Sequence, residues 1–462
     1  MQVILINSPL FRNNGHSHED SLPPLGLGYI ATQLQSNGIS VEFIDAINED
    51  ICLSDLIERL YFFKPEYILI NIFTTNFFLV EELITSLVFP THIIIGGPAT
   101  KQLQTKIIKW NTKNLIDIVI GDGELIIVDL LKNKIKDKPT VEIPHRRIFY
   151  VDQDSSYFVH DISEIPLNRD LFSIKPMRNL YGNWEISIIT GRGCIYNCTF
   201  CSAARKLNPD YPIRERSISS ITSELLEIKT QYPDCTSIRI LDDLFLKDSS
   251  SIIKAIRIFS QFSFHWRSMA HIRTFQQIDQ NIINELKETG CKELFIGIES
   301  GSPKILRSIN KTYDRSLIKS TISRLFRAGI NVKGYFIYGF PDESREDMQL
   351  TYDFANELKN LSFKYRINFR TSVFQFRPYH GTKIYSELKD KYPNLDDHQV
   401  LFNEALSRLI GRDQYNFQSN NYSKVSLRII HDYICRTNDL NGSRTIFKGI
   451  TKYNRRKHTK EV

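Results

Sequence analysis

Residues 191–201 read Gly-Arg-Gly-Cys-Ile-Tyr-Asn-Cys-Thr-Phe-Cys and directly follow Glu185–Thr190, a run with the composition of a β-strand. The stretch therefore places three thiols, those of Cys194, Cys198 and Cys201, on one loop at the carboxyl end of a strand. Three thiolates within eight residues can wrap a cubane iron–sulfur cluster. Because such a cluster needs four ligands, one iron stays open, and an open coordination position can bind and activate a small molecule.

Two other readings of these cysteines remain open on the residues alone. A structural zinc site takes four Cys or His ligands, usually in two separated pairs, and the chain has no second pair. His145 and His160 are possible fourth ligands, although neither has a motif around it. The trio could also be a chance group of buried thiols. The remaining cysteines are isolated from one another, so we expect free thiols and no second cluster: Cys52, Cys235, Cys291 and Cys435.

Downstream of the motif, apolar runs alternate with helical patterns. The predicted strands are Glu185–Thr190, Ser237–Leu241, His265–Ala270, Glu293–Ile298, Val332–Tyr338 and Asn368–Phe376. The predicted helices are Ser217–Gln231, Ser249–Phe262, Gln280–Thr289, Ser316–Ala328 and Glu343–Lys359. Six strands with crossover helices are typical of a parallel barrel or part of one, whose chemistry lies at the carboxyl ends of the strands. We therefore predict a partial (β/α)6 barrel over residues 183–385 and a small helical C-terminal region over 386–462.

Upstream of the motif, the first 135 residues show the same alternation in shorter units. The predicted strands are Val3–Asn7, Val41–Asp45, Tyr67–Phe73, His92–Gly97 and Asp117–Gly121, and the predicted helices are Leu25–Asn37, Ile51–Phe63, Phe77–Val88 and Lys101–Trp110. Near-continuous Ile/Val/Leu strands separated by helices indicate a doubly wound parallel α/β sheet covered on both faces. Residues 136–182 lose this pattern, and we predict a connector there.

Composition narrows the class of protein. The hydrophobic fraction of 42% and the charged fraction of 24% are those of a globular protein, and no apolar run approaches the roughly 18 residues that a membrane span needs. Met1–Leu10 lacks the features of a signal peptide, so we expect a cytoplasmic protein with reduced cysteines. The net charge of +7 comes mostly from Lys448–Lys460, which is typical of a solvated terminus, and nucleic acid is an unlikely partner.

The C-x3-C-x2-C loop with an aromatic residue before its last cysteine resembles the signature of the radical S-adenosylmethionine (SAM) superfamily. The resemblance implies a 4Fe–4S cluster on Cys194, Cys198 and Cys201, with SAM chelating the open iron. Reductive cleavage of SAM then releases a 5′-deoxyadenosyl radical. Phe200 matches the aromatic position that the family places near the adenine.

The same resemblance suggests SAM-binding residues at the ends of the predicted barrel strands. Asp242 of Leu241-Asp242-Asp243 ends the second strand, and Arg267 and Arg273 flank the third. Glu299 and Ser300 end the fourth, where a carboxylate can accept hydrogen bonds from ribose hydroxyls or an ammonium group. Each of these residues has an ordinary alternative as a helix cap or a salt-bridge partner. We assign no catalytic side chain.

The N-terminal domain resembles the cobalamin-binding members of the superfamily. The matching stretches are residues 22–31 (Leu-Pro-Pro-Leu-Gly-Leu-Gly-Tyr-Ile-Ala), 96–98 (Gly-Gly-Pro), 121–124 (Gly-Asp-Gly-Glu) and, in the barrel, 377–382 (Arg-Pro-Tyr-His-Gly-Thr). The resemblance implies a cobalamin contact by Gly96, Gly97, Gly121, Gly123 and Glu124. At the four glycines, the missing side chain would let the backbone lie close against a corrin. These glycines would also serve as turns in any doubly wound domain.

One departure from many cobalamin proteins concerns the lower axial ligand. The Asp-x-His-x-x-Gly motif is absent after the first predicted strand, where the chain reads Asn7-Ser8-Pro9-Leu10. His16 and His18 are expected to be loop residues. If cobalamin binds, we expect its lower face to be free of histidine.

Together, the two resemblances imply a cobalamin-dependent radical C-methyltransferase acting on an unactivated carbon of a small-molecule, specialised metabolite. An electron donor such as flavodoxin or ferredoxin would reduce the cluster. The alternative is a radical dehydratase, or a rearrangement, ring-contraction or cyclisation enzyme, with a vestigial or structural first domain. A non-enzymatic redox or cobalamin sensor is a third reading, against which the charged residues at the barrel mouth argue.

Overall fold

The computed structural model describes residues 2–10, 22–171, 176–311, 314–392, 395 and 420–442. The chain divides into two compact units. The first unit contains Met1–Asp243 and Pro378–His398, and the second contains Leu244–Arg377 and Gln399–Val462. The domain boundaries proposed from the sequence stay predictions.

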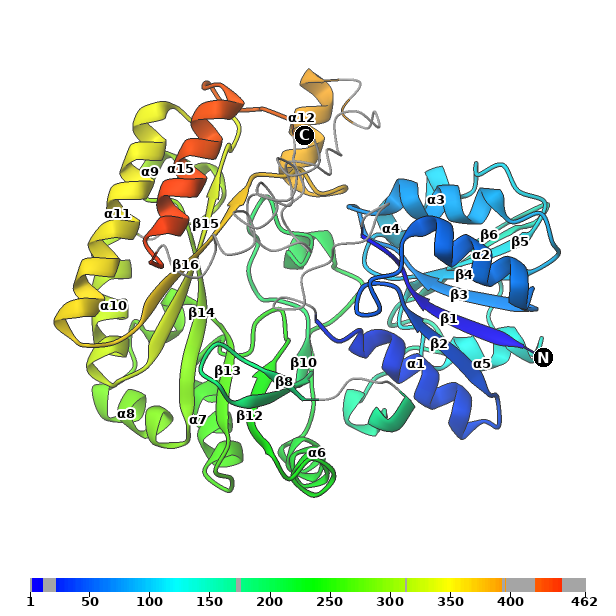
Figure 1. The fold of residues 1–462 in the computed structure, drawn as a ribbon, viewed down its shortest axis with the longest axis horizontal. Helices are drawn as coiled ribbons and strands as arrows, with labels where there is room; N and C mark the ends of the chain where they lie inside the picture. The colour runs from blue at the N-terminus through cyan, green and yellow to red at the C-terminus, as the bar shows by residue number, and fades with distance from the viewer. Residues whose placement is uncertain are drawn as a thin grey trace, which may run out of the picture. The chain divides into compact units, whose positions relative to one another are not determined.

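The N-terminal part of the first unit is a doubly wound α/β sheet, which confirms the predicted fold class (Figure 1). Its strand order is β2-β1-β3-β4-β5-β7-β6, and every neighbouring pair is parallel except β6 with β7. The five predicted strands are observed as β1 (Val3–Asn7), β2 (Val41–Asp45), β3 (Tyr67–Asn71), β4 (His92–Gly96) and β5 (Leu115–Gly121), with ends that differ by up to two residues from the prediction. The helices are α1 (Leu25–Ser36), α2 (Leu53–Phe63), α3 (Phe77–Ser86), α4 (Thr100–Ile107) and α5 (Ile126–Leu131), with α1 and α5 on one face of the sheet and α2 to α4 on the other.

Two strands of this sheet lie in the segment that was predicted to be an irregular connector. They are β6 (Val141–Ile143) and β7 (Arg146–Val151), and β7 adds to the sheet parallel to β5. The prediction missed them because β6 is only three residues long and β7 begins with two arginines. Arg146 is nevertheless buried, since its guanidinium donates to the backbone carbonyls of Trp110, Thr112 and Asn114.

The second sheet has the order β16-β15-β14-β13-β12-β9-β8, and β8 (Met177–Arg178) is antiparallel to β9. The six predicted barrel strands are observed as β9 (Trp184–Ile188), β12 (Cys235–Ile240), β13 (His265–Ala270), β14 (Cys291–Glu299), β15 (Asn331–Tyr338) and β16 (Phe369–Gln375), with ends that differ by up to two residues from the prediction. The helices are α6 (Ile218–Gln231), α7 (Ser249–Phe259), α8 (Gln280–Glu288), α9 (Pro303–Ser308), α10 (Arg315–Arg327) and α11 (Arg345–Lys364). This alternation confirms the predicted partial barrel.

Among the described residues, two further helices follow the barrel, as predicted for the C-terminal region. They are α12 (Lys383–Lys391), which belongs to the first unit, and α15 (Leu427–Asp439), which packs on β16 and α11 in the second. The basic stretch Lys448–Lys460 lies outside the described residues.

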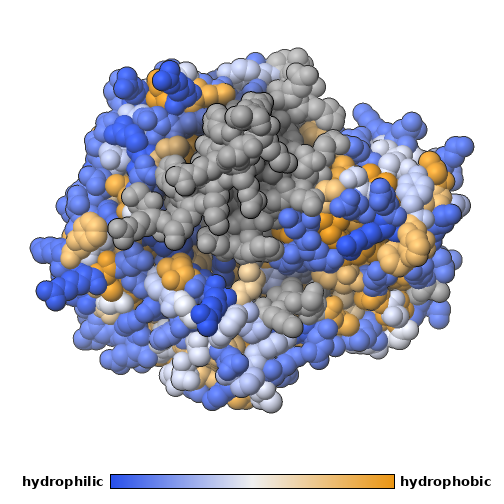
Figure 2. Space-filling view, in the orientation of Figure 1, coloured by the Kyte–Doolittle hydropathy of each residue, from blue (hydrophilic) through white to orange (hydrophobic). Residues whose placement is uncertain are grey.

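Among the residues coloured by hydropathy in Figure 2, hydrophilic ones predominate, with hydrophobic ones between them. Among the described residues, no helix combines the length and the apolar character that a membrane crossing requires.

Candidate cofactor site

The three motif cysteines lie on one loop of the first unit, after β9 and the two-residue strand β10 (Gly191–Arg192). All three are partly exposed free thiols. Burial raises the pKa of the Cys201 thiol to about 12, and the charges of Cys198, Asp243 and Cys194 add to the rise. All three thiols lie within one loop segment of eight residues, as suits ligands of one cluster. Iron binding has to displace their protons, because the thiolate is the ligand.

The donor set suits an iron–sulfur cluster. Across the part of the chain that the structure describes, no three His, Cys, Asp or Glu side chains converge closely enough to hold one metal ion. A cubane does not require such convergence, because each of its irons takes its own thiolate. The donor set of three cysteines on one loop therefore fits a 4Fe–4S cluster with one open iron.

Asp242 and Asp243 hold the chain that leads into this loop. The Thr190 backbone N–H and Oγ1 donate to the two oxygens of Asp242 at 2.7 and 2.5 Å, and Gly193 N–H donates to Asp243 at 3.3 Å. Burial raises the pKa of Asp242 to about 6, although the hydrogen bonds from Thr190 oppose the rise. The structure thus gives Asp242 a positioning role, and its predicted contact with SAM stays a prediction.

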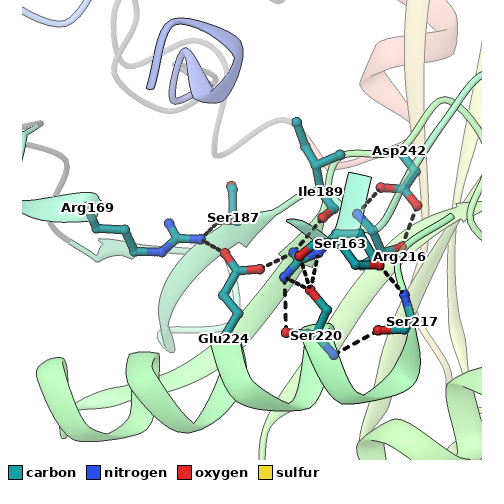
Figure 3. A network of polar contacts seen from close by, with 10 residues as sticks. Ser163, Arg169, Ser187, Ile189, Arg216, Ser217, Ser220, Glu224 and Asp242 are labelled. Carbon is teal, nitrogen blue, oxygen red and sulfur yellow. Dashed lines mark hydrogen bonds and ion pairs between the residues drawn. The ribbon is translucent and has the colours of Figure 1, made fainter. Parts of the chain in front are cut away.

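A buried ion network supports the same segment from the other side (Figure 3). Glu224 of α6 accepts from Arg169 at 2.5 Å and from Arg216. Each arginine also donates to a backbone carbonyl of the strand end, Arg169 to Ser187 and Arg216 to Ile189, both at 3.0 Å. All three charged side chains are close to fully buried. The strand that leads to the cysteine loop is therefore fixed by charge-assisted hydrogen bonds.

The carboxyl ends of β2, β1 and β3 carry a continuous chain of buried polar side chains. Asn7 donates to Asp45 at 2.7 Å, and Asn71 donates to Asn7 at 2.8 Å. The Ser8 backbone and hydroxyl both donate to Asn71 at 2.8 Å, and Asn76 donates to Ser8 at 2.6 Å. Among the described residues this chain contains no histidine, and the expected histidine-free lower face stays a prediction. His16 and His18 lie outside the described residues.

The two glycines at the end of β4 differ in what surrounds them. A Cβ built on Gly96 meets no heavy atom of the described residues within 4 Å. Gly97 has φ +107°, and a Cβ on it would lie 2.9 Å from the backbone N and O of Ile72. Gly96 thus has room for an added atom among the described residues, whereas Gly97 is required by the turn and by its packing. A cobalamin contact by either glycine stays a prediction.

The glycines at the end of β5 are also packed by protein. Gly121 has φ +106°, and a Cβ there would lie 2.2 Å from the Val151 carbonyl oxygen. At Gly123 a Cβ would lie 2.9 Å from Ile30 Cδ1, the movable end of a side chain. Both positions are accounted for by the fold, and a cobalamin contact by either remains a prediction.

The acidic residues of the same turn pair with arginines that flank the cysteine loop. Arg192, two residues before Cys194, donates to Asp122 at 2.8 Å and also to Glu124. Arg214, of the two-residue strand β11 (Arg214–Glu215), donates to Asp122 through both terminal nitrogens. These ion pairs join the carboxyl end of β5 to the cluster loop, and all of their residues belong to the first unit.

In the second unit, the end of β14 carries a buried ion pair. Glu299, with φ +65°, accepts from Lys311 at 2.8 Å, and Lys311 also donates to the Gly297 carbonyl at 2.8 Å. Burial lowers the pKa of the neighbouring His271 to about 2, and the charges of Lys311 and Arg273 lower it further. At the end of β14 the polar groups are thus a carboxylate, an ammonium and a neutral imidazole. Glu299 remains a candidate contact for SAM, with its charge balanced by Lys311.

The remaining predicted contacts have structural partners. Arg267, the third residue of β13, pairs with Glu293 at 3.1 Å, and Arg370 donates to the same carboxylate at 2.6 and 2.7 Å. Ser300 is fully buried, and its hydroxyl lies 2.9 Å from that of Thr351. Phe200 is partly exposed on the cysteine loop. Roles in SAM binding for these three residues stay predictions.

Sequence reasoning missed the charged residues that hold the loops in place. Arg192 stood inside the quoted motif and Asp122 inside the Gly-Asp-Gly-Glu turn, but neither was singled out. Their pairing joins residues 70 positions apart, and a single sequence carries no signal for such a contact. The sequence likewise gave no signal for the roles of Arg169, Glu224 and Lys311.

Comparison with known proteins gives two family matches. Residues 188–355 match the radical SAM superfamily, and residues 14–131 match the B12 binding domain. The first match contains the cysteine loop and the second contains the turn from Gly121 to Glu124.

Curated relatives cover most of the chain at low identity. An uncharacterised methyltransferase of Pyrococcus horikoshii is 27% identical over 73% of each chain. Cytidylyl-2-hydroxyethylphosphonate methyltransferase of Streptomyces wedmorensis is 24% identical over 77% of each. An anaerobic magnesium-protoporphyrin IX monomethyl ester cyclase of Cereibacter sphaeroides is 21% identical over 86% of this chain and 65% of its own.

Two solved structures share the fold. The cobalamin-dependent SAM radical enzyme OxsB, solved with aqua-cobalamin and SAM, superposes with a TM-score of 0.64 at 15% identity, over 92% of this chain. This chain spans 64% of OxsB. The radical SAM methyltransferase TsrM of Kitasatospora setae gives a TM-score of 0.58 at 15% identity, over 84% of this chain and 78% of its own.

Proposed function

Because the chain belongs to the radical SAM superfamily and carries a B12 binding domain, we propose that it is a cobalamin-dependent radical C-methyltransferase acting on a small-molecule substrate. The observation that carries this proposal is that the proposed cluster site and the proposed cobalamin site belong to the same compact unit. The cysteine loop and the open strand end at Gly96 both belong to the first unit. An enzyme that uses two cofactors on one substrate needs them at a fixed spacing.

The residues suit both cofactors. Cys194, Cys198 and Cys201 would hold the cluster, which supplies the electron that cleaves SAM. Phe200, Asp242, Arg267, Glu299 and Ser300 are the proposed SAM-binding set. Gly96, Gly97, Gly121, Gly123 and Glu124 form the proposed cobalamin edge, with the open backbone of Gly96 as its structural support. Cobalamin, when bound, supplies the transferable methyl group.

The partners and the location follow from the same chemistry. Reductive cleavage of SAM needs a low-potential electron donor, and we propose a flavodoxin or a ferredoxin. All seven cysteines are free thiols, and an oxygen-sensitive cluster persists best in a reducing compartment, so we place the protein in the cytoplasm.

Anaerobic reconstitution tests the cluster assignment. We expect one 4Fe–4S cluster per chain and dithionite-dependent formation of 5′-deoxyadenosine from SAM. Replacing Cys194, Cys198 or Cys201 with Ala should abolish both, because each removes one of three protein ligands. Cys435→Ala, which removes an exposed thiol on α15, is the matched control and should change neither. Full iron content in the Cys194→Ala variant contradicts the assignment.

Product analysis tests the methyl transfer. Turnover with methyl-deuterated SAM should give a product that carries the labelled methyl, together with both 5′-deoxyadenosine and S-adenosylhomocysteine. The likeness to the cyclase, which spans 86% of this chain, favours cyclisation as the second candidate function. An unmethylated, ring-closed product without S-adenosylhomocysteine would establish that reading instead.

A further inference from the structure

Glu124 has one satisfied oxygen and one unsatisfied oxygen. The residue is 4% exposed and lies in the turn after β5. Its Oε1 accepts from Arg192, whereas its buried Oε2 has no hydrogen-bond partner among the described residues. A buried acceptor without a donor is costly, so such an oxygen is commonly completed by a ligand or by water.

The neighbouring carboxylate shows the contrast. Asp122 also lies in the turn after β5, and both of its oxygens are used. Oδ1 accepts from Arg192 at 2.8 Å and from Arg214 at 3.1 Å, and Oδ2 accepts from Arg214 and from the Val159 backbone at 3.2 Å. Both oxygens of Asp122 thus accept hydrogen bonds from described residues, whereas Oε2 of Glu124 accepts none from them.

Arg192 connects this turn to the cluster loop. Its guanidinium donates to two carboxylates, to that of Asp122 at 2.8 Å and to that of Glu124. The side chain is therefore a fixed cation, and its backbone runs through Gly193 into Cys194. A displacement of Glu124 must move Arg192 or break a charge-assisted hydrogen bond.

We propose that Glu124 Oε2 accepts a hydrogen bond from a primary amide on the rim of the corrin, and that Arg192 is a positioning residue that couples this contact to the cluster loop. The inference rests on the proposed cobalamin function and deepens it. The corrin periphery carries acetamide and propionamide groups, which supply the N–H donor that Oε2 lacks. Glu124 then binds a ligand amide with one oxygen and the cluster loop with the other.

Such a coupling is reciprocal. If cobalamin binding depends on the Arg192–Glu124 pair, a change in the cluster loop alters cobalamin affinity, and a change in the turn alters the cluster. Each effect appears in a part of the molecule distant in sequence from the substitution. A purely structural ion pair would lower stability without producing either effect.

The test compares Arg192→Met, Glu124→Gln and the double variant. Hydroxocobalamin is titrated anaerobically by absorbance, and the reduced cluster is examined by electron paramagnetic resonance. We expect each single variant to bind hydroxocobalamin about tenfold more weakly. The double variant should be no weaker than either single variant, because both substitutions remove the same relay. Glu124→Gln should also shift the cluster signal, although the cysteines are untouched.

Arg147→Met is the matched control. Arg147, on β7, pairs with Asp117 of β5 at 2.6 Å, and its side chain is about as exposed as that of Arg192. Asp117 lies near the amino end of β5, whereas Glu124 follows the carboxyl end. This variant should keep the affinity for hydroxocobalamin and the cluster signal. Should Arg192→Met fail to fold, Glu124→Gln decides alone, because it keeps the size and the hydrogen-bonding shape of the side chain.

The possible results separate this inference from the proposed function. A wild-type protein that binds no hydroxocobalamin overturns the cobalamin function itself. If the wild-type protein binds hydroxocobalamin, any of three results would overturn the coupling alone. These are an unchanged affinity in Arg192→Met, losses that multiply to about a hundredfold in the double variant, and an unchanged cluster signal in Glu124→Gln.

Discussion

At the scale of single residues, Gly96 is the position where added bulk should exclude a corrin. The sequence pointed equally to Gly97, but Gly97 is packed against Ile72 and only Gly96 is open. We expect Gly96→Leu to abolish hydroxocobalamin binding with little change in thermal unfolding. Gly97→Ala should instead destabilise the protein by about 1–2 kcal/mol, because alanine resists the left-handed backbone conformation. Tight binding by a folded Gly96→Leu variant would contradict the proposed cobalamin edge.

Glu343 provides a second prediction, based on its ionisation. It lies before α11, fully buried, and Oε2 accepts from the Gly339 and Phe340 backbone. Burial raises the pKa of Glu343 to about 8, against an ordinary value of 4.5. The hydrogen bonds and Lys304 oppose the rise, and Asp347 adds to it.

The sign follows from which state holds the proton. Between the ordinary pKa of 4.5 and the raised pKa of about 8, the folded state keeps a proton that the unfolded state has lost. The contribution of Glu343 to stability is therefore full below this window and is lost as the pH rises through it, by at most about 1.4 kcal/mol per pH unit. The Glu343→Gln side chain cannot ionise. The unfolding free energy of this variant should therefore increase relative to that of the wild type as the pH rises. Denaturant titrations that give parallel pH profiles would contradict this assignment.

At the scale of elements, the Arg169–Glu224–Arg216 network should support the strand that leads to the cysteines. Glu224→Leu leaves two buried guanidinium groups without their carboxylate, and we expect a loss of about 3–5 kcal/mol in unfolding free energy. Glu357→Leu is the control, because Glu357 also sits between two cations, Arg315 and Lys319, but in a partly exposed setting. Its loss should stay within about 1 kcal/mol. Equal losses in chemical denaturation would contradict the importance of burial here.

The helices and strands were predicted well because their signal is local. Continuous apolar runs such as Tyr67–Asn71 and helical patterns such as Gln280–Glu288 can be read from neighbouring residues alone, and the structure places these elements within a few residues of the prediction. β7 was missed because Arg146 and Arg147 interrupt the pattern of apolar residues that predicts a strand. Their charges are satisfied by the Trp110 carbonyl and by Asp117, which only the folded chain brings near.

The metal ligands of the site could be predicted from the sequence, but the residues that hold the ligand loop in place could not. The cysteine spacing is a local pattern, so Cys194, Cys198 and Cys201 could be named from the sequence. The arginines that orient the loop contact carboxylates about 70 to 90 residues away, and a charged residue in a single sequence does not reveal its partner. Asp242 and Gly97 show the opposite case. The sequence predicted both as cofactor contacts, but the fold gives each a structural explanation.

At the scale of the whole molecule, the division into units does not follow the division into sequence families. The first unit contains the cobalamin-binding domain together with β9, the cysteine loop and β12, whereas β13 to β16 belong to the second. The N-terminal sheet and the cysteine loop are joined by the ion pairs of Arg192 and Arg214. We therefore expect them to behave as one cooperative element when a ligand binds.

Hydrogen exchange measured with and without hydroxocobalamin tests this expectation. A ligand that binds only the folded state stabilises the cooperative unit containing its site, by about 2.7 kcal/mol at a hundred times its Kd. Protection should therefore rise in α1 and β5 and also in peptides covering β10 and β11, which are distant from them in sequence. Peptides of α10 and α11, in the second unit, should change little. Protection confined to the N-terminal sheet would show that the Arg192 and Arg214 pairs do not transmit binding, whereas equal protection of both units would show that the molecule opens as a single body.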